Sequence, residues 1–308
     1  MDDLISRQAA VDAICNACGK IDCDKMDKCE KLQLPPANCS EFPNNSDTIS
    51  RQAAIDGGND GIIQLQQGDC LELMKNIPDG SVDMILCDLP YGTTMNKWDS
   101  VIDFDELWTA YKRIIKNNGA VVLFGQGLFT AELVCSNKEM FRYRLVWEKT
   151  KAGGFLNARR MPLQAHEDIS VFYKKLPTYN PQMEEGKAYV KRAVTNGDGG
   201  CYGKFDRVGQ TNINNGTRFP RSVLRFSNDN HNSIHKTQKP VQLLEYLIRT
   251  YTNEGETVLD NCMGSGSTGV ACVNLKRNFI GMELEEEYFK IAEERINNAR
   301  LNQQTGGD

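Results

Sequence analysis

The chain has 308 residues, enough for one large domain and a smaller module, and its 40% hydrophobic and 25% charged residues are typical of a globular protein. No apolar run approaches the roughly 20 residues that a membrane span requires, and the N-terminus lacks the apolar core of a secretory signal, so we expect a cytoplasmic protein without membrane contact. Eleven cysteines, an odd number, argue against a disulfide framework and for reduced thiols.

Charge is unevenly distributed along the chain. The net charge is −5, yet residues 141–240 hold 18 Lys and Arg against 8 Asp and Glu, which leaves a net charge of −15 on the rest. One basic region facing nucleic-acid phosphates would produce this pattern, and so would a solvated basic surface.

Residues 1–57 differ from the rest and are predicted to form an N-terminal appendage. The octapeptide at 5–12 (ISRQAAVD) recurs at 49–56 (ISRQAAID), and each copy is predicted to be a short helix with Ser6 or Ser50 as its N-cap. Four of the five cysteines between the copies have the residue type of a structural zinc site but an irregular spacing: Cys15, Cys18, Cys23 and Cys29. The segment is compatible with a zinc site and with a helical appendage that has free thiols.

Strands and helices alternate from residue 62 onward. The first half is predicted to contain strands at 62–69, 81–91 and 119–125, with helices at 70–78, 104–116 and near 127–137. Strands at 142–149 and 168–174 follow, and then mostly loop at 176–235. The last part is predicted to be a helix at 239–252 and strand–turn–helix units at 257–275 and 278–296. This alternation predicts an α/β fold with a doubly wound, mostly parallel sheet, whose ligands lie at the carboxyl ends of the strands.

A glycine-rich turn between a strand and a helix is a candidate ligand site. The segment 258–269 (VLDNCMGSGSTG) allows a ligand to approach the backbone closely, and the helix N-terminus after it favours polar or anionic groups. It is not a P-loop, because no Gly-Lys-Ser/Thr ends it. Glu283, at the end of the next strand, can accept hydrogen bonds from two ribose hydroxyls. A dinucleotide enzyme, or a structural turn beside a surface glutamate, would show the same two features.

The tetrapeptide 88–91 (DLPY), which closes an apolar strand, helps to choose among these alternatives. An enzyme acting on the amino group of a base needs acceptors for two amino hydrogens, and the Asp88 carboxylate and the Leu89 carbonyl can supply them. Pro90 restricts the backbone, and Tyr91 offers a flat face for a base swung out of the duplex. Such a reaction requires no enzyme nucleophile and no catalytic metal, since positioning and electrostatics carry it.

At these residues the chain resembles the amino-group DNA methyltransferases, whose loop reads Asp/Asn/Ser-Pro-Pro-Tyr/Phe/Trp. The resemblance runs from about residue 62 to residue 296. The order of motifs matches the β group of that family, in which the sheet is circularly permuted. The resemblance implies a Rossmann-like fold of the S-adenosylmethionine-dependent type, with a catalytic half at 62–149, a target-recognition insert at 150–235 and a cofactor-binding half at 236–300.

The resemblance also implies roles for single residues. The implied cofactor is S-adenosylmethionine, bound by Asp69 near the adenine, Asp260, Gly264 and Gly266 around the methionine, Glu283 at the ribose, and Lys239 nearby. Leu89 stands where the family usually has proline, and we expect leucine to be tolerated because the backbone carbonyl acts there. A first-position aspartate is more typical of adenine-N6 enzymes, and serine of cytosine-N4 enzymes. Cytosine-C5 chemistry is excluded, because it needs a cysteine nucleophile, usually in a Pro-Cys pair that this chain lacks.

The insert combines basic and aromatic side chains, which can contact phosphates, pair with guanine edges or stack on bases. The arginines expected to contact DNA are Arg159, Arg160, Arg218 and Arg221. A long solvated insertion would have the same composition. His166 and Glu167, just before a strand, are interpreted as a structural hydrogen-bond pair rather than as catalytic residues.

The sequence therefore predicts a site-specific methyltransferase that flips a base out of double-stranded DNA and methylates adenine N6. The alternatives are transfer to cytosine N4, to RNA or to a protein amide, and a DNA-binding module that holds cofactor without turnover. The resemblance is consistent with a homodimer, with a restriction endonuclease as partner, and with a bacterial or phage-encoded cytoplasmic enzyme.

Overall fold

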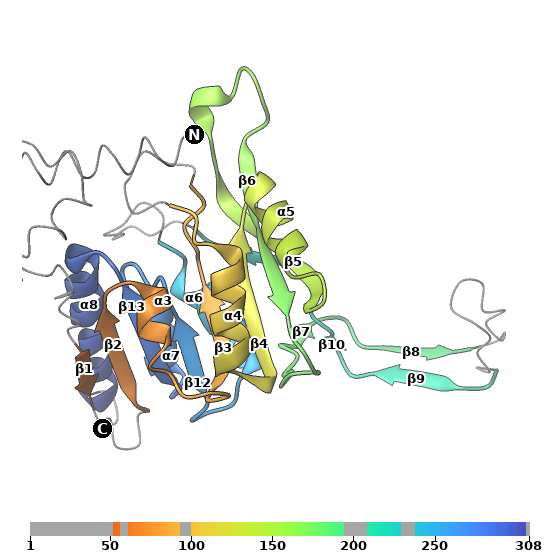
Figure 1. Cartoon of the computed structure of the whole chain (residues 1–308). Coiled ribbons are helices and arrows are strands. Elements are labelled where there is room, and N and C mark those ends of the chain that lie inside the picture. Colours follow the sequence, from red (N-terminus) through yellow and green to blue (C-terminus); the bar gives the residue numbers. More distant parts are fainter. Residues whose placement is uncertain (1–51, 56–60, 93–99, 194–207, 229–237, 306–308) are drawn as a thin grey trace, which may run out of the picture. The chain divides into compact units, whose positions relative to one another are not determined.

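The structure is a computed structural model that describes residues 52–55, 61–92, 100–193, 208–228 and 238–305. Within these ranges the centre of the fold is a nine-stranded sheet in the order β1-β2-β13-β12-β3-β4-β6-β5-β11 (Figure 1). Its strands are β1 (Gln52–Ile55), β2 (Ile63–Gln67), β3 (Val82–Cys87), β4 (Ile115–Gly125), β5 (Phe141–Gly153), β6 (Gln164–Phe172), β11 (Val223–Phe226), β12 (Thr257–Asp260) and β13 (Asn278–Glu283).

The five consecutive strands β2, β13, β12, β3 and β4 run parallel to one another. β6 is antiparallel to both β4 and β5, β11 is parallel to β5, and β1 is an antiparallel edge strand on β2. The predicted doubly wound, mostly parallel α/β sheet is thus confirmed.

Helices cover both faces of the sheet (Figure 1). One face carries α3 (Cys70–Met74), α4 (Phe104–Ile114) and α5 (Gly127–Ser136), and the other carries α6 (Val241–Tyr251), α7 (Ser267–Asn274) and α8 (Glu286–Thr305). Along β3, Ile85 packs in the core beneath α3, α4 and α5, whereas Met84 and Leu86 pack in the core beneath α6, α7 and α8. Both faces of the strand are therefore buried, which explains why it is apolar without alternation. No helix in the described ranges is long and apolar enough to span a membrane.

The helix predicted for the second copy of the octapeptide is wrong. Gln52–Ile55 forms β1, which pairs antiparallel with β2 from Gln52↔Gln66 to Ile55↔Ile63. An octapeptide gives only about two helical turns, too few for a helix that is stable by itself, and the edge of β2 offers a backbone ladder instead. The first copy and the cysteines Cys15, Cys18, Cys23 and Cys29 lie outside the described residues, so the helix there and the zinc site stay predictions.

Two further segments differ from expectation. α4 ends at Ile114 because Ile115 has an extended conformation and pairs with Val82, so β4 begins earlier than predicted. The region predicted as mostly loop contains β11 and the short strands β7 (Glu184–Glu185), β8 (Tyr189–Arg192), β9 (Thr211–Asn214) and β10 (Thr217–Arg218). Most of their residues are exposed, so no apolar periodicity revealed them.

The carboxyl ends of the central strands meet at one edge of the sheet. Asp69 follows β2, Asp88 follows β3, Asp260 ends β12 and Glu283 ends β13. At this edge the last paired residue of β4, Gly125, lies opposite Asp168, which in turn lies opposite Val146. The rest of the β5–β6 hairpin therefore continues past the end of β4, on the side of the sheet where the strand ends gather (Figure 1).

Candidate active site

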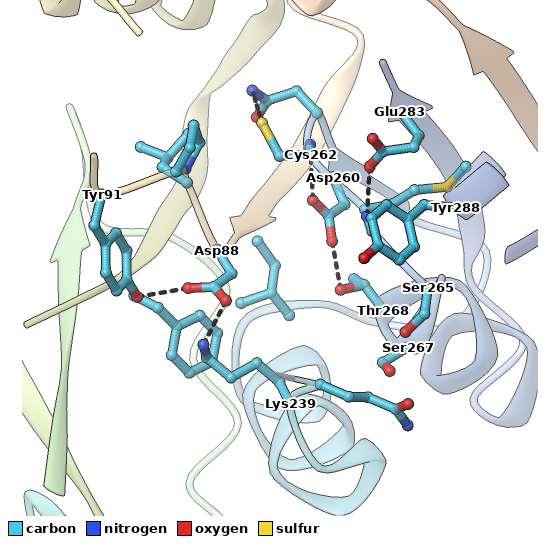
Figure 2. Close-up of a pocket in the computed structure, with 18 of the residues that line it drawn as sticks. Asp88, Tyr91, Lys239, Asp260, Cys262, Ser265, Ser267, Thr268, Glu283 and Tyr288 are labelled. Atoms are coloured by element: carbon cyan, nitrogen blue, oxygen red, sulfur yellow. Dashed lines mark hydrogen bonds and ion pairs between the residues drawn. The ribbon is translucent and has the colours of Figure 1, made fainter. Parts of the chain in front are cut away.

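A cavity of about 530 Å³ lies at this carboxyl edge. Both predicted motifs line it: the corner from Asp88 to Tyr91, and the glycine-rich bend with Glu283. Figure 2 shows Asp88, Tyr91 and Lys239 on one side of the cavity and Asp260, Thr268 and Glu283 on the other. Asp69 and Lys239, also predicted site residues, line the same cavity.

The corner is built on the end of β3. The Tyr91 hydroxyl donates a hydrogen bond of 2.5 Å to Asp88 Oδ1, and its ring lies against Phe129 with the centroids 4.7 Å apart. Burial, followed by the negative charge of Asp88, raises the pKa of Tyr91 well above its ordinary value, so the phenol stays a neutral donor. The Leu89 side chain is buried in the core layer of α4, which accounts for an apolar residue where the family usually has proline.

Lys239 reaches this corner from the residue pair before α6. Its ammonium forms an ion pair with Asp88 Oδ2, a second ion pair of 3.2 Å with Glu167 Oε2, and lies 5.1 Å from the centroid of the Phe124 ring. Burial alone would lower the pKa of Lys239, but the charges of Asp88 and Glu167 outweigh it and the pKa is raised. The lysine is therefore a buried cation held against the corner from Asp88 to Tyr91.

Two further residues line the cavity: Glu167, which the sequence suggested as a structural partner of His166, and Lys149, which the sequence interpretation did not single out. Glu167 points into the cavity and its Oε1 lies 2.5 Å from Lys149 Nζ, whereas His166 is exposed. Burial would raise the pKa of Glu167, but Lys239 and then Lys149 hold it below its ordinary value, so the carboxylate is charged. β6 begins at Gln164, before the start of the predicted strand, and strand alternation therefore separates His166 from Glu167.

The glycine-rich bend joins β12 to α7. Gly264 has φ of +51°, and no atom lies within 4 Å of the place where a Cβ would stand, so its backbone is open to a ligand. Gly266 has φ of +77°, but a Cβ there would come within 2.8 Å of Ala292 Cβ in α8. Glycine at 266 is therefore required by packing against α8, and glycine at 264 leaves room beside the cavity.

Two buried carboxylates support the bend. Asp260 accepts hydrogen bonds from the Thr268 hydroxyl at 2.6 Å and from the Cys262 amide at 3.2 Å, and burial raises its pKa to about 6. Glu283 accepts from the Gly264 amide through Oε2 and from the Glu285 amide through Oε1, each at 2.9 Å. Because a carboxylate offers about four acceptor positions, Glu283 keeps capacity for two further donors from a ligand.

Asp69 and Arg295 have structural partners of their own. Asp69 is the N-cap of α3 and accepts from the Leu71 and Glu72 amides at 2.8 and 3.3 Å. Arg295 of α8 donates to the Ser265 hydroxyl at 2.8 Å and thereby ties the bend to the helix. Asp69 thus lies at the cavity with one carboxylate oxygen engaged, and Arg295 is a support that sequence reasoning missed.

Cysteines also lie beside the cavity, at Cys70, Cys87 and Cys262. The Asn261 amide is 3.5 Å from both the Cys70 and the Cys262 sulfur. Burial raises the pKa of Cys87 to about 12, and the pKa of Cys262 is raised well above its ordinary value. These thiols are protonated at neutral pH, which is unfavourable for a cysteine nucleophile.

The cavity fits S-adenosylmethionine. An open glycine bend, an acidic residue at the end of the next strand and a helix N-terminus are the features that hold the nucleoside and the charged tail of such a ligand. Figure 2 shows Glu283 on one side of the cavity and Asp88 on the other. Gly264 lines the same cavity and donates its amide hydrogen to Glu283. The volume of about 530 Å³ lies within the usual range of small-molecule sites, roughly 300–1,000 Å³.

The four arginines predicted to contact DNA differ in their surroundings. Arg159 and Arg160 are exposed near the tip of the β5–β6 hairpin, and Arg221 is exposed 3.9 Å from Glu184. The Arg218 guanidinium is bonded within the protein, to Asn214 Oδ1 at 2.5 Å and to the Lys187 carbonyl, and lies over the Tyr189 ring. Arg218 thus joins short strands of the insert, whereas the other three side chains are accessible.

Comparison with known proteins agrees with this geometry. The model of the DNA methylase family, of the N6/N4 type, matches residues 82–294, and a model of an RMKL-like methyltransferase domain matches residues 10–152. The type II methyltransferase M.HinfI of Haemophilus influenzae is 27% identical over 280 residues, covering 79% of this chain and 71% of the relative. The DNA adenine methyltransferase YhdJ of Escherichia coli (strain K12) is 29% identical over 244 residues, covering 74% of this chain and 81% of the relative.

Solved structures show the same fold. The crystal structure of an M1.HpyAVI–SAM complex matches with a TM-score of 0.54 and 27% identity, covering 76% of this chain and 99% of that one. The cytosine-N4-specific PvuII DNA methyltransferase matches with a TM-score of 0.52 and 16% identity, covering 80% and 93% of the two chains. The fold and the cavity define an S-adenosylmethionine-dependent methyltransferase. The chain belongs to the N6/N4 DNA methylase family.

Proposed function

We propose that this enzyme methylates N6 of adenine at a specific sequence in double-stranded DNA, with the corner from Asp88 to Tyr91 as its catalytic group. The observation that carries the proposal is that this corner and the Gly264–Glu283 side line one cavity. Aspartate at the first position favours adenine over cytosine, and a relative of this chain is named a DNA adenine methyltransferase.

The residues of the corner account for the chemistry. When bound, S-adenosylmethionine supplies an electrophilic methyl group. The Asp88 carboxylate and the Leu89 carbonyl accept the two amino hydrogens of the target base, which directs the nitrogen lone pair at the methyl group. Tyr91 stacks on the flipped base and orients Asp88 through its 2.5 Å hydrogen bond. Transfer would break the bond between the methyl group and sulfur, and the adjacent carboxylate would stabilise the positive charge that develops on the amino nitrogen until one of its hydrogens leaves as a proton.

Sequencing of DNA from an expressing host tests this proposal. The host should lack its own DNA methyltransferases, and a host with the empty vector is the control. We expect N6-methyladenine at one short motif, read by long-read sequencing that detects modified bases. N4-methylcytosine at one motif would show that cytosine, and not adenine, is the target base. Unmodified DNA from a host that contains the folded enzyme would contradict the proposal and favour RNA or protein as the substrate.

The β5–β6 hairpin is the part of the insert that we assign to DNA contact. It extends past the catalytic edge of the sheet, and its tip combines Arg159 and Arg160 with Phe155 and Leu156, which are 75% and 87% exposed. Residues 151–163 include three basic residues and no acidic residue. Positive charge with exposed apolar side chains beside a base-accepting cavity complements a duplex whose base pair must be opened.

Replacing Arg159 and Arg160 together by alanine is expected to weaken DNA binding uniformly across sequences. If each arginine neutralises one phosphate, the slope of log K against log salt becomes shallower by about 1–2. Fluorescence anisotropy with labelled duplexes over a range of salt concentrations measures this slope. Arg142→Ala, an exposed arginine at the opposite end of β5, is the matched control and should leave the slope unchanged. Equal slopes for all three proteins would remove the hairpin from the DNA interface.

A homodimer, a restriction endonuclease partner and a cytoplasmic location in a bacterial or phage-infected cell also stay predictions. Size-exclusion chromatography with light scattering measures the first of these directly.

A further inference from the structure

Four side chains of alternating charge form a chain of ion pairs in the wall of the cavity. Lys149 contacts Glu167 at 2.5 Å, Glu167 contacts Lys239 at 3.2 Å, and Lys239 contacts Asp88. They come from β5, β6, the residues before α6 and the residue after β3, and all four line the cavity. The two cations and two carboxylates balance one another in charge.

Lys239 is buried, so its charge interacts mainly with the groups that contact it. Its side chain is only 9% exposed and lies over the Phe124 ring, and that of Glu167 is 11% exposed. A buried ammonium needs anionic partners to offset its lost hydration. In the described residues Asp88 and Glu167 are the carboxylates that pair with it.

Sharing the ammonium has a consequence for Asp88. If Glu167 were neutral, Asp88 would be the single carboxylate paired with Lys239. The ion pair between them would then be stronger, and it would draw the Asp88 carboxylate away from the amino group of the base. The cluster would also carry a net positive charge where positive charge develops on the attacking nitrogen. Both effects slow methyl transfer without touching the Gly264 side of the cavity, where the cofactor fits.

We propose that Glu167 is a positioning residue for methyl transfer: by sharing the ammonium of Lys239, it keeps the Asp88 carboxylate available to the amino group of the target base. The inference rests on the proposed role of Asp88 as the acceptor of that group. It assigns to Glu167 a function in the reaction in place of the structural pairing with His166 that the sequence suggested.

Steady-state kinetics of Glu167→Gln test the proposal on a duplex that contains the motif marked by the wild-type enzyme. We expect kcat to fall about 10- to 100-fold, because a misplacement of the reacting groups by about 1 Å costs this much. The KM for S-adenosylmethionine should stay within about threefold of wild type, since uniform binding is not altered. Glu167→Asp keeps the charge on a shorter stem and should give an intermediate kcat.

A double-mutant cycle with Lys239→Met separates positioning from a merely structural role. If Glu167 acts through Lys239, then Glu167→Gln changes kcat less than about threefold once Lys239 is Met. Effects that multiply in the double variant would overturn the proposal, as would a kcat of Glu167→Gln within threefold of wild type. Should Glu167→Gln fail to fold, the same cycle with Glu167→Asp gives the same two readings.

Asp168→Asn is the matched control for this experiment. Asp168 is the next residue of β6, but its carboxylate pairs with Arg144 at 3.4 Å and is not among the described residues lining the cavity. We expect wild-type kcat for this variant, and a loss like that of Glu167→Gln would assign the effect to β6 as a whole and overturn the proposal. Thermal unfolding of every variant checks the fold. The kcat of each variant is compared with that of the wild type on the motif that the wild type marks. If that motif carried methylated cytosine instead of adenine, the proposed function would be corrected, but the test of Glu167 would still hold.

Discussion

Asp88→Ala is expected to lower the rate of methyl transfer by about 10²–10³-fold while binding of S-adenosylmethionine largely survives. The substitution removes the carboxylate that we propose accepts an amino hydrogen and faces the developing positive charge. It also deprives Lys239 of one of its two carboxylate partners. The cofactor side of the cavity, at Gly264 and Glu283, has no hydrogen bond to Asp88 in the described structure.

Transfer of tritium from labelled S-adenosylmethionine to mixed-sequence DNA measures the rate, and titration calorimetry measures cofactor affinity. Asp88→Asn keeps one acceptor oxygen and should retain more activity than Asp88→Ala. Tyr91→Phe removes the 2.5 Å hydrogen bond to Asp88 but keeps a ring for stacking, so we expect a smaller loss than for Tyr91→Ala. A folded Asp88→Ala protein that no longer binds cofactor would contradict the division of the cavity into a transfer side and a cofactor side.

Glu283→Gln is expected to have the opposite profile, with cofactor affinity as the main loss. A hydrogen bond to a charged group contributes about 1.5–3 kcal/mol, which corresponds to a Kd roughly 10- to 100-fold higher when the charge is removed. Glutamine keeps one oxygen that can accept from the Gly264 amide, so the bend keeps this hydrogen bond while the one from the Glu285 amide is lost. At saturating cofactor we expect kcat close to that of wild type, because the corner at Asp88 is not altered.

Calorimetric titration with S-adenosylmethionine and with its demethylated product measures this change. The matched control is Glu285→Gln, an exposed glutamate just beyond the strand end. Equal affinity in wild type and Glu283→Gln would remove Glu283 from the cofactor site. A fall in kcat at saturating cofactor, with unchanged Kd, would place Glu283 in the transfer step instead.

Much of the site followed from local sequence. The tetrapeptide at 88–91 and the bend at 258–269 each follow a predicted strand, at the end where a parallel sheet binds its ligands, and they line one cavity. This inference was possible because parallel strands bring their carboxyl ends together whatever their order in the sheet. Leu89 was expected to be tolerated, and its side chain is buried in the core.

Other features depended on contacts between distant residues. The pattern at 49–56 suggested a helix, but pairing with β2 makes Gln52–Ile55 a strand. A Cβ at Gly266 would come within 2.8 Å of Ala292 Cβ in α8, so glycine there has a packing role that the sequence did not indicate. The short strands of the insert are mostly exposed, so their residues show no apolar period.

The sequence by itself determined the order of the motifs, the parallel α/β architecture and the two sides of the cavity, because these depend on strand periodicity, on glycine and proline conformation and on where strands end. Only the tertiary structure decided which charges meet. Glu167 reaches Lys239 and Lys149 because β6 lies between β4 and β5, and its neighbour His166 points away. No local pattern specifies that strand order, since it results from the packing of the whole sheet.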